Sequence, residues 1–119
     1  MEELIARISS AAGIEEEVAS KSVGIILNFL RKEGPSDAVA KVMAAMPGAE
    51  AAANAHDDGE HADAGSGLMG LANQLSHAGL GMGDMQAVGK ELFAAVHEKA
   101  GADAVGEIAA SIPGLHQFI

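Results

Sequence analysis

Apolar residues recur along the chain at intervals of three and four positions, which is the spacing of one stripe on an amphipathic helix. The longest stripe predicts a helix that ends at about Glu33. Its inward positions are Val18, Ser22, Ile25, Ile26, Phe29 and Leu30. Strict alternation of apolar and polar residues, the mark of a half-buried strand, is almost missing. The pattern therefore predicts an all-α fold.

Glycine and proline punctuate the chain and set the limits of about six expected helices. Their approximate ranges are 1–12, 15–33, 37–46, 67–78, 84–100 and 103–112. Asp84, Asp103 and either Ser36 or Asp37 are the expected N-caps of three of them, because their side-chain oxygens can accept hydrogen bonds from free backbone N–H groups.

One segment occurs twice. The stretch DAVAKVMAAMPG at 37–48 recurs as DAVGEIAASIPG at 103–114, with six of twelve positions identical. A shift of 67 positions also superposes the earlier apolar stripes, so that Leu4 falls on Leu71 and Ile25 on Leu92. The sequence therefore predicts two related three-helix units, 1–48 and 67–114. Because three short helices bury little surface alone, we expect the units to pack about a pseudo-twofold axis, with their second helices at the centre.

An Ala-rich, acidic stretch at 49–66 separates the two units. It has almost no large apolar side chains, so it cannot bury enough surface to offset the entropy of ordering, and we expect a flexible linker whose first part can continue as a helical turn. The tail at 115–119 ends in Phe118 and Ile119 and is apolar enough to dock onto the body. The chain of 119 residues is expected to form a single domain.

The net charge of the chain limits the classes of molecule that it is expected to bind. Seven Lys and Arg residues against seventeen Asp and Glu residues give a net charge of −10. Such a surface repels nucleic-acid phosphates and anionic lipids, so binding to nucleic acid or to a membrane is not expected. The acidic start MEELIARISS lacks the features of a secretory signal, and a cytoplasmic location is expected. Cysteine is absent, which excludes disulfides and thiolate chemistry.

Several segments outside the linker resemble a known family. They are MEELIARI, VGIILNFLRKEGP, GLMGLANQL, AGLGMGDMQAVGKELF and IPGLHQF. Together they are similar to small bacterial helical proteins grouped as domain of unknown function 2267. The resemblance implies an all-α bacterial protein with no established activity. It supplies no catalytic or ligand-binding residues.

Histidines and carboxylates, which are common metal ligands, gather in the linker. They are His56, Asp57, Asp58, Glu60, His61 and Asp63. The spacing of His56 and His61 suits no single helical face, and Gly59 favours a flexible backbone. A solvated linker is the preferred interpretation, and binding of zinc, nickel or copper is the alternative that remains open.

Other motifs do not support catalysis. The stretch GSGLMG at 65–70 matches the dinucleotide fingerprint but follows a polar linker instead of a strand. Ser76 and His77 are adjacent, and successive helix residues do not face each other. His97 falls on Leu30 in the repeat and is expected to be a partly buried structural histidine. No catalytic, cofactor-binding or metal-ligating residue is assigned, and we expect a protein that is not an enzyme and needs no cofactor.

The leading functional hypothesis is a helical module that binds a protein partner or a second copy of itself. Apolar residues beyond the helical stripes form its expected surface patch. They are Leu80, Met82, Leu115, Phe118 and Ile119. The alternative is a small-ligand or divalent-metal binder that uses the linker or a cleft between the units. Such a cleft should bring together polar groups such as Asn28, Asn73, Gln74 or His97.

Overall fold

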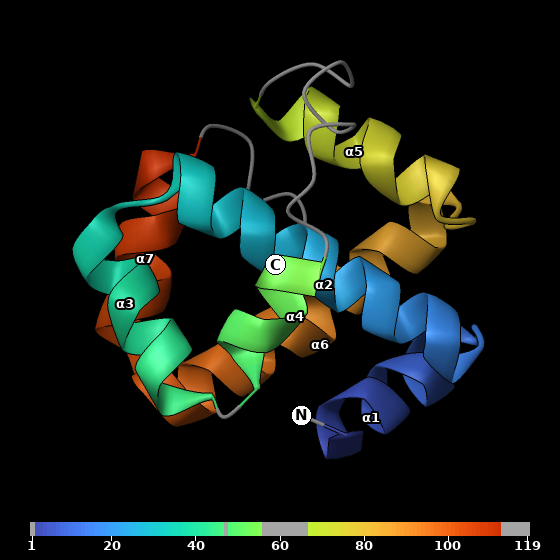
Figure 1. Cartoon of the computed structure of the whole chain (residues 1–119), viewed down its shortest axis with the longest axis horizontal. Helices are drawn as coiled ribbons and strands as arrows, with labels where there is room; N and C mark the ends of the chain where they lie inside the picture. Colours follow the sequence, from blue (N-terminus) through green and yellow to red (C-terminus); the bar gives the residue numbers. More distant parts are fainter. Residues whose placement is uncertain (1, 47, 56–66, 113–119) are drawn as a thin grey trace.

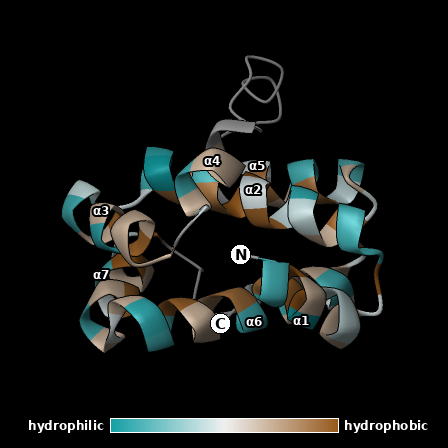
Figure 2. Cartoon of the chain, turned by 60° about the horizontal axis from the view of Figure 1, so that its bottom comes forward, coloured by the Kyte–Doolittle hydropathy of each residue, from teal (hydrophilic) through white to brown (hydrophobic). Residues whose placement is uncertain are grey.

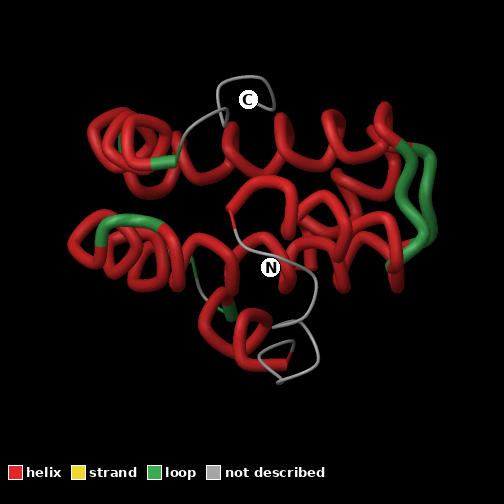
Figure 3. The backbone as a smooth tube through the Cα atoms, turned by 90° about the horizontal axis from the view of Figure 1, so that it is seen from above, coloured by secondary structure: helices red, strands yellow, loops and turns green. Residues whose placement is uncertain are grey.

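The computed structural model describes residues 2–46, 48–55 and 67–112, and these residues form helices joined by short loops, with no strand among them (Figures 1 and 3). The helices are α1 (Glu2–Ala12), α2 (Glu16–Glu33), α3 (Ser36–Ala45), α4 (Ala49–Ala55), α5 (Gly67–His77), α6 (Met82–Ala100) and α7 (Ala102–Ser111). The all-α prediction is confirmed. All six expected helices are present, and α4 is an additional one.

The two longest helices are α2 and α6, and each of the other helices packs on at least one of them. Helix α5 packs on α2, whereas α1 packs on both α6 and α2. At one end of the molecule α3 lies against α7 (Figure 1). Seen from the side, α2, α4 and α5 lie on one side and α6 and α1 on the other, with α3 and α7 closing the end (Figure 2). The helices thus enclose one core.

The core consists of apolar side chains, most of them aliphatic, and every described helix contributes to it. The largest side chains that are fully buried are Ile8, Leu27, Leu30, Leu92 and Ile108. Each lies on the apolar stripe of its helix or next to it, so the 3.6-residue period of the sequence decides which side chains leave water. Removal of apolar surface from water at about 25 cal/mol per Å² is the main stabilising term.

Two polar residues are buried among the described residues, and both have hydrogen-bond partners. The Ser22 hydroxyl donates to the Ala19 carbonyl oxygen at 2.8 Å. The Asn28 Oδ1 accepts from Arg31 Nη2 at 3.2 Å. Because a buried polar group without a partner would cost about 1–3 kcal/mol, these bonds allow the stripe of α2 to include polar residues.

Residues 49–55 differ from the sequence-based prediction. A flexible linker was expected from 49 onward, but these residues form α4, which packs on α2. Ala49 and Ala53 are 0% exposed. Alanine is the best helix former, and its small side chain allows close approach to a neighbouring helix that supplies the larger groups. The rest of the expected linker, 56–66, lies outside the described residues, as does the tail 115–119.

The expected side-chain caps are also corrected. Helix α6 begins two residues before Asp84, with Gly81 at the N-cap, and Asp84 Oδ2 accepts a hydrogen bond from the Gly81 N–H at 3.1 Å. Asp84 is therefore the third residue of the helix, and its carboxylate accepts from the backbone N–H of the N-cap residue. The N-caps of α3 and α7 are Pro35 and Gly101, and neither helix has a side-chain cap.

Gly101 connects α6 to α7 with a φ of +96°, which side chains with a Cβ rarely adopt. An added Cβ would meet nothing within 4 Å, so the cost of substitution is a backbone cost. We expect Gly101→Ala to lower the free energy of unfolding by about 1–2 kcal/mol in urea denaturation. The matched control is Gly106→Ala inside α7, where the Cβ also has open space. It should raise the same quantity by about 0.5–1 kcal/mol, and equal effects of the two substitutions would contradict the argument.

Candidate functional site

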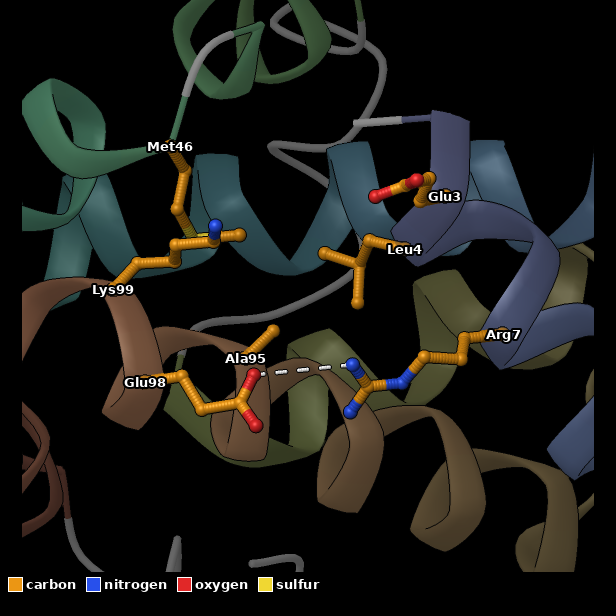
Figure 4. A pocket seen from close by; sticks show the side chains of 7 residues that line it. All are labelled: Glu3, Leu4, Arg7, Met46, Ala95, Glu98 and Lys99. Atoms are coloured by element: carbon orange, nitrogen blue, oxygen red, sulfur yellow. Dashed lines mark ion pairs between the residues drawn. The ribbon is translucent and has the colours of Figure 1, made fainter.

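A cavity of about 530 Å³ lies where α1, α6 and the end of α3 meet. Its lining residues are Glu3, Leu4, Arg7, Met46, Ala95, Glu98 and Lys99. Figure 4 shows these side chains arranged around a central hollow, with contributions from α1, from α6 and from Met46, which follows α3. We call this cavity the α1–α6 cleft. It joins segments that are distant in sequence, so it exists only in the folded chain.

The floor of the α1–α6 cleft is apolar. Leu4, Met46 and Ala95 are 8%, 5% and 5% exposed, so each presents only a small part of its surface to the cavity. Leu4 belongs to the apolar stripe of α1, and Met46 is the C-cap residue of α3. The floor is thus a part of the apolar core that is open to the cavity. An apolar group that enters the cavity would be buried against it and removed from water.

The rim of the cleft is charged, and Arg7 is at its centre. The guanidinium of Arg7 lies between two carboxylates of α6, with Nη2 at 3.4 Å from Oε2 of Glu91 and Nη1 at 3.8 Å from Oε2 of Glu98. Figure 4 marks the pair with Glu98. Glu91 and Glu98 are seven positions apart, two helical turns, and therefore share one face of α6. These groups are at least 31% exposed, so the pairs add little to stability, about 0–1 kcal/mol each.

A second cavity, of about 430 Å³, lies between α3, α4 and the end of α2. Its lining residues are Arg31, Ser36, Val39, Ala40, Met43, Ala44 and Glu50. We call it the α3–α4 groove. Val39 is buried and Met43 is half-buried, so the groove also has an apolar floor.

The polar residues that the sequence singled out for a ligand cleft line neither cavity. Asn28 is buried and bonded to Arg31, and Asn73 is exposed on α5. His97 is exposed on α6, so the prediction that it is partly buried is wrong. The two matched positions therefore differ in burial, since Leu30 on α2 is buried and His97 on α6 is exposed.

The expected apolar patch is only partly present among the described residues. Met82 is 66% exposed at the start of α6, as expected for a patch residue. Leu80 is 4% exposed and belongs to the core instead. Leu115, Phe118 and Ile119 lie outside the described residues. A single exposed methionine is ordinary for a protein surface and does not by itself mark an interface.

Within the described ranges, no group of three or more His, Asp or Glu side chains is placed to hold a metal ion. His56, His61 and the neighbouring acids lie outside these ranges, so metal binding by the linker stays a prediction. Zinc titration calorimetry of the wild type and of the double variant His56→Ala/His61→Ala tests it, and equal weak heats would remove it.

None of the described helices has the length and apolar character needed to cross a membrane.

The charged residues that line the α1–α6 cleft were not predicted from the sequence; they are Glu3, Arg7, Glu98 and Lys99. A signal was available in the sequence repeat, because Arg7 aligns with Gln74 and the two copies of the repeat therefore differ in charge at this position. Comparison with known proteins adds no assignment, since no protein-family model, curated protein or solved structure matches the chain significantly. The resemblance to domain of unknown function 2267 therefore stays a prediction.

Proposed function

We propose that this protein is a non-enzymatic helical module that binds another protein, or a second copy of itself, through the α1–α6 cleft. The observation that carries the proposal is the combination of an apolar floor with a charged, half-exposed rim. Protein interfaces have this anatomy, with an apolar centre that excludes water and a polar rim that selects the partner. An apolar side chain of the partner would enter the hollow, and its polar neighbours would contact the rim.

The repeat register supports a role for the rim other than packing. At positions shifted by 67, the counterparts of Arg7, Glu91 and Glu98 are Gln74, Gly24 and Arg31. Helix α5 packs on α2 without the charge cluster that accompanies the packing of α1 on α6. Because α5 packs on α2 without these charges, helix packing does not require them. The Arg7 cluster can therefore contact a partner.

We also propose that α1–α3 and α5–α7 are two copies of one unit related by a pseudo-twofold axis. Helix α1 of the first unit packs on α6 of the second, α5 of the second packs on α2 of the first, and α3 packs on α7. An exchange of first helices between the units is the pattern expected of a duplicated, intertwined pair. In this arrangement the α1–α6 cleft lies between the units.

Substitution of the cleft floor tests the interaction proposal. Ala95→Leu places a larger side chain in the hollow, and Ala94→Leu adds the same side chain to the exposed neighbouring position of α6. In affinity capture from cell extract and in light scattering of the purified protein, we expect the wild type and Ala94→Leu to retain the same partner or the same oligomer. Ala95→Leu should weaken the association by about tenfold or more, as expected at the centre of an interface. Equal association of all three proteins would refute the proposal.

A small-ligand binder is the second candidate function. The volume of the α1–α6 cleft, about 530 Å³, falls within the range of ligand pockets, roughly 300–1,000 Å³. Under this alternative, fragments found by ligand-detected NMR would bind the wild type and Ala94→Leu but not Ala95→Leu, while no protein partner would be captured. In either case the net charge of −10 disfavours a nucleic-acid partner.

A further inference from the structure

Met82 is the one large apolar side chain that is exposed among the residues whose burial is described, at 66%. It is the first residue of α6 and lies between Gly81 and Gly83. A side chain between two glycines projects from the surface without a neighbouring side chain on either side. The start of α6 therefore presents a single apolar group to other molecules.

Gly83 is not explained by the folding of this chain. Gly81 is the N-cap of α6, a position that tolerates glycine well. Gly83 lies inside the helix, where glycine is less favourable than alanine, and its φ is not positive. An added Cβ at Gly83 would meet nothing within 4 Å. A glycine in such a place allows the backbone of another molecule to approach closely.

The α1–α6 cleft is a suitable receptor for this side chain. Its apolar floor of Leu4, Met46 and Ala95 is open to the cavity. Methionine is unbranched and flexible, so it adapts to irregular apolar hollows. Ala95 comes thirteen positions after Met82 on the same helix, which is roughly 20 Å along the helix axis. Met82 therefore cannot enter the cleft of its own chain, but the Met82 of a second copy can.

The charges around Met82 complement those on the rim of the cleft. Glu3 and Lys99 are exposed on the rim and form no ion pair with another described residue. Asp84, two positions after Met82, would face Lys99 of the second copy. The backbone N–H groups of Met82 and Gly83 lie in the first turn of α6 and have no acceptor within the helix. A carboxylate such as Glu3 is favourable beside them.

We propose that the occupant of the α1–α6 cleft is Met82 of a second copy of this chain, so that copies associate head to tail. The two contacting surfaces are different, so a pair of copies keeps one free Met82 and one free cleft. Further copies can then add until a ring closes. The inference rests on the proposed function, because it names the partner of the same site.

Two substitutions of Met82 test the contact. Met82→Gln keeps the length of the side chain but makes it polar, whereas Met82→Leu keeps it apolar. Light scattering of the purified full chain at increasing concentration measures self-association. We expect Met82→Leu to associate like the wild type and Met82→Gln to associate about tenfold or more weakly, as for the central residue of an interface. Equal association of the two variants, or a wild type that stays monomeric, would overturn the inference.

A mixing experiment tests the head-to-tail arrangement. Met82→Gln keeps an open cleft, whereas Ala95→Leu fills the cleft and keeps Met82. Each variant should be monomeric alone, and an equal mixture should form a pair that does not grow, because only one intact contact is available. Absence of this pair would overturn the inference. If Ala95→Leu does not fold, the comparison of Met82→Gln with Met82→Leu still decides, since both change only an exposed side chain.

The same measurements separate this inference from the proposed function. Association or partner capture that is lost in Ala95→Leu but unchanged in Met82→Gln would show that another group enters the cleft. The head-to-tail contact would then be wrong, and the cleft would still be the interaction site. Association that depends on neither Ala95 nor Met82 would overturn both.

Discussion

Leu30→His is expected to lower the free energy of unfolding by about 3 kcal/mol or more. Leu30 is 1% exposed in the covered face of α2, so the substitution removes a packed side chain and places an imidazole in an apolar environment. No polar side chain is buried near it on α2 except Ser22 and Asn28, which already have hydrogen-bond partners. Urea denaturation followed by circular dichroism measures the change.

The reciprocal substitution at the matched position is the control. His97 aligns with Leu30 in the repeat but is exposed on α6. His97→Leu should therefore change the free energy of unfolding by no more than about 0.5 kcal/mol, as is usual for surface positions. If Leu30→His lowered the free energy of unfolding as little as His97→Leu, the claim that Leu30 is buried and His97 is exposed would be wrong.

Leu92→Ala is expected to cost about 3–4 kcal/mol of unfolding free energy, because it deletes a fully buried side chain at the centre of α6 and leaves a cavity. Helix α6 contacts α1, α2, α3 and α7, so neighbouring helices cannot all move to fill the space. Met82→Ala, which truncates a side chain that is 66% exposed at the start of the same helix, is the comparison and should have a small effect. A cost below about 1 kcal/mol for Leu92→Ala would indicate that α6 is not the core helix described above.

The positions of the six expected helices could be predicted because two independent signals agreed. The apolar stripe of α2 includes Ser22 and Phe29, both of which are buried, and glycine or proline marks the ends of most helices. Boundaries were accurate to within about two residues, the usual uncertainty of helix ends. The N-caps were less predictable, because the choice among Gly81, Asp84 and their neighbours depends on how the loop before the helix approaches it.

Helix α4 could not be predicted from its own residues. Its sequence, AEAAANA, carries no apolar stripe, since the large side chains of the contact belong to α2. The missing signal lay in α2, where Leu27 lies outside the predicted stripe and is nevertheless fully buried. An apolar residue that breaks the amphipathic pattern of one helix indicates that another segment covers it.

The α1–α6 cleft was not predictable because its parts come from helices about 90 residues apart. Arg7 and Glu98 are ordinary surface charges in the sequence, and nothing in their local pattern indicates that they meet. Asn28 and His97, which looked more informative by residue type, lie elsewhere. Residue type alone does not define a binding site, whereas packing of helices from different parts of the chain does.

The most direct test of the cleft as the interaction site is an amide chemical-shift map of the isotope-labelled protein with its captured partner or, for self-association, at increasing concentration. We expect the perturbed amides to cluster at Glu3–Arg7, at Met46 and at Ala95–Lys99. Perturbations confined to other surfaces, or a protein that stays monomeric and captures no partner, would contradict the proposal.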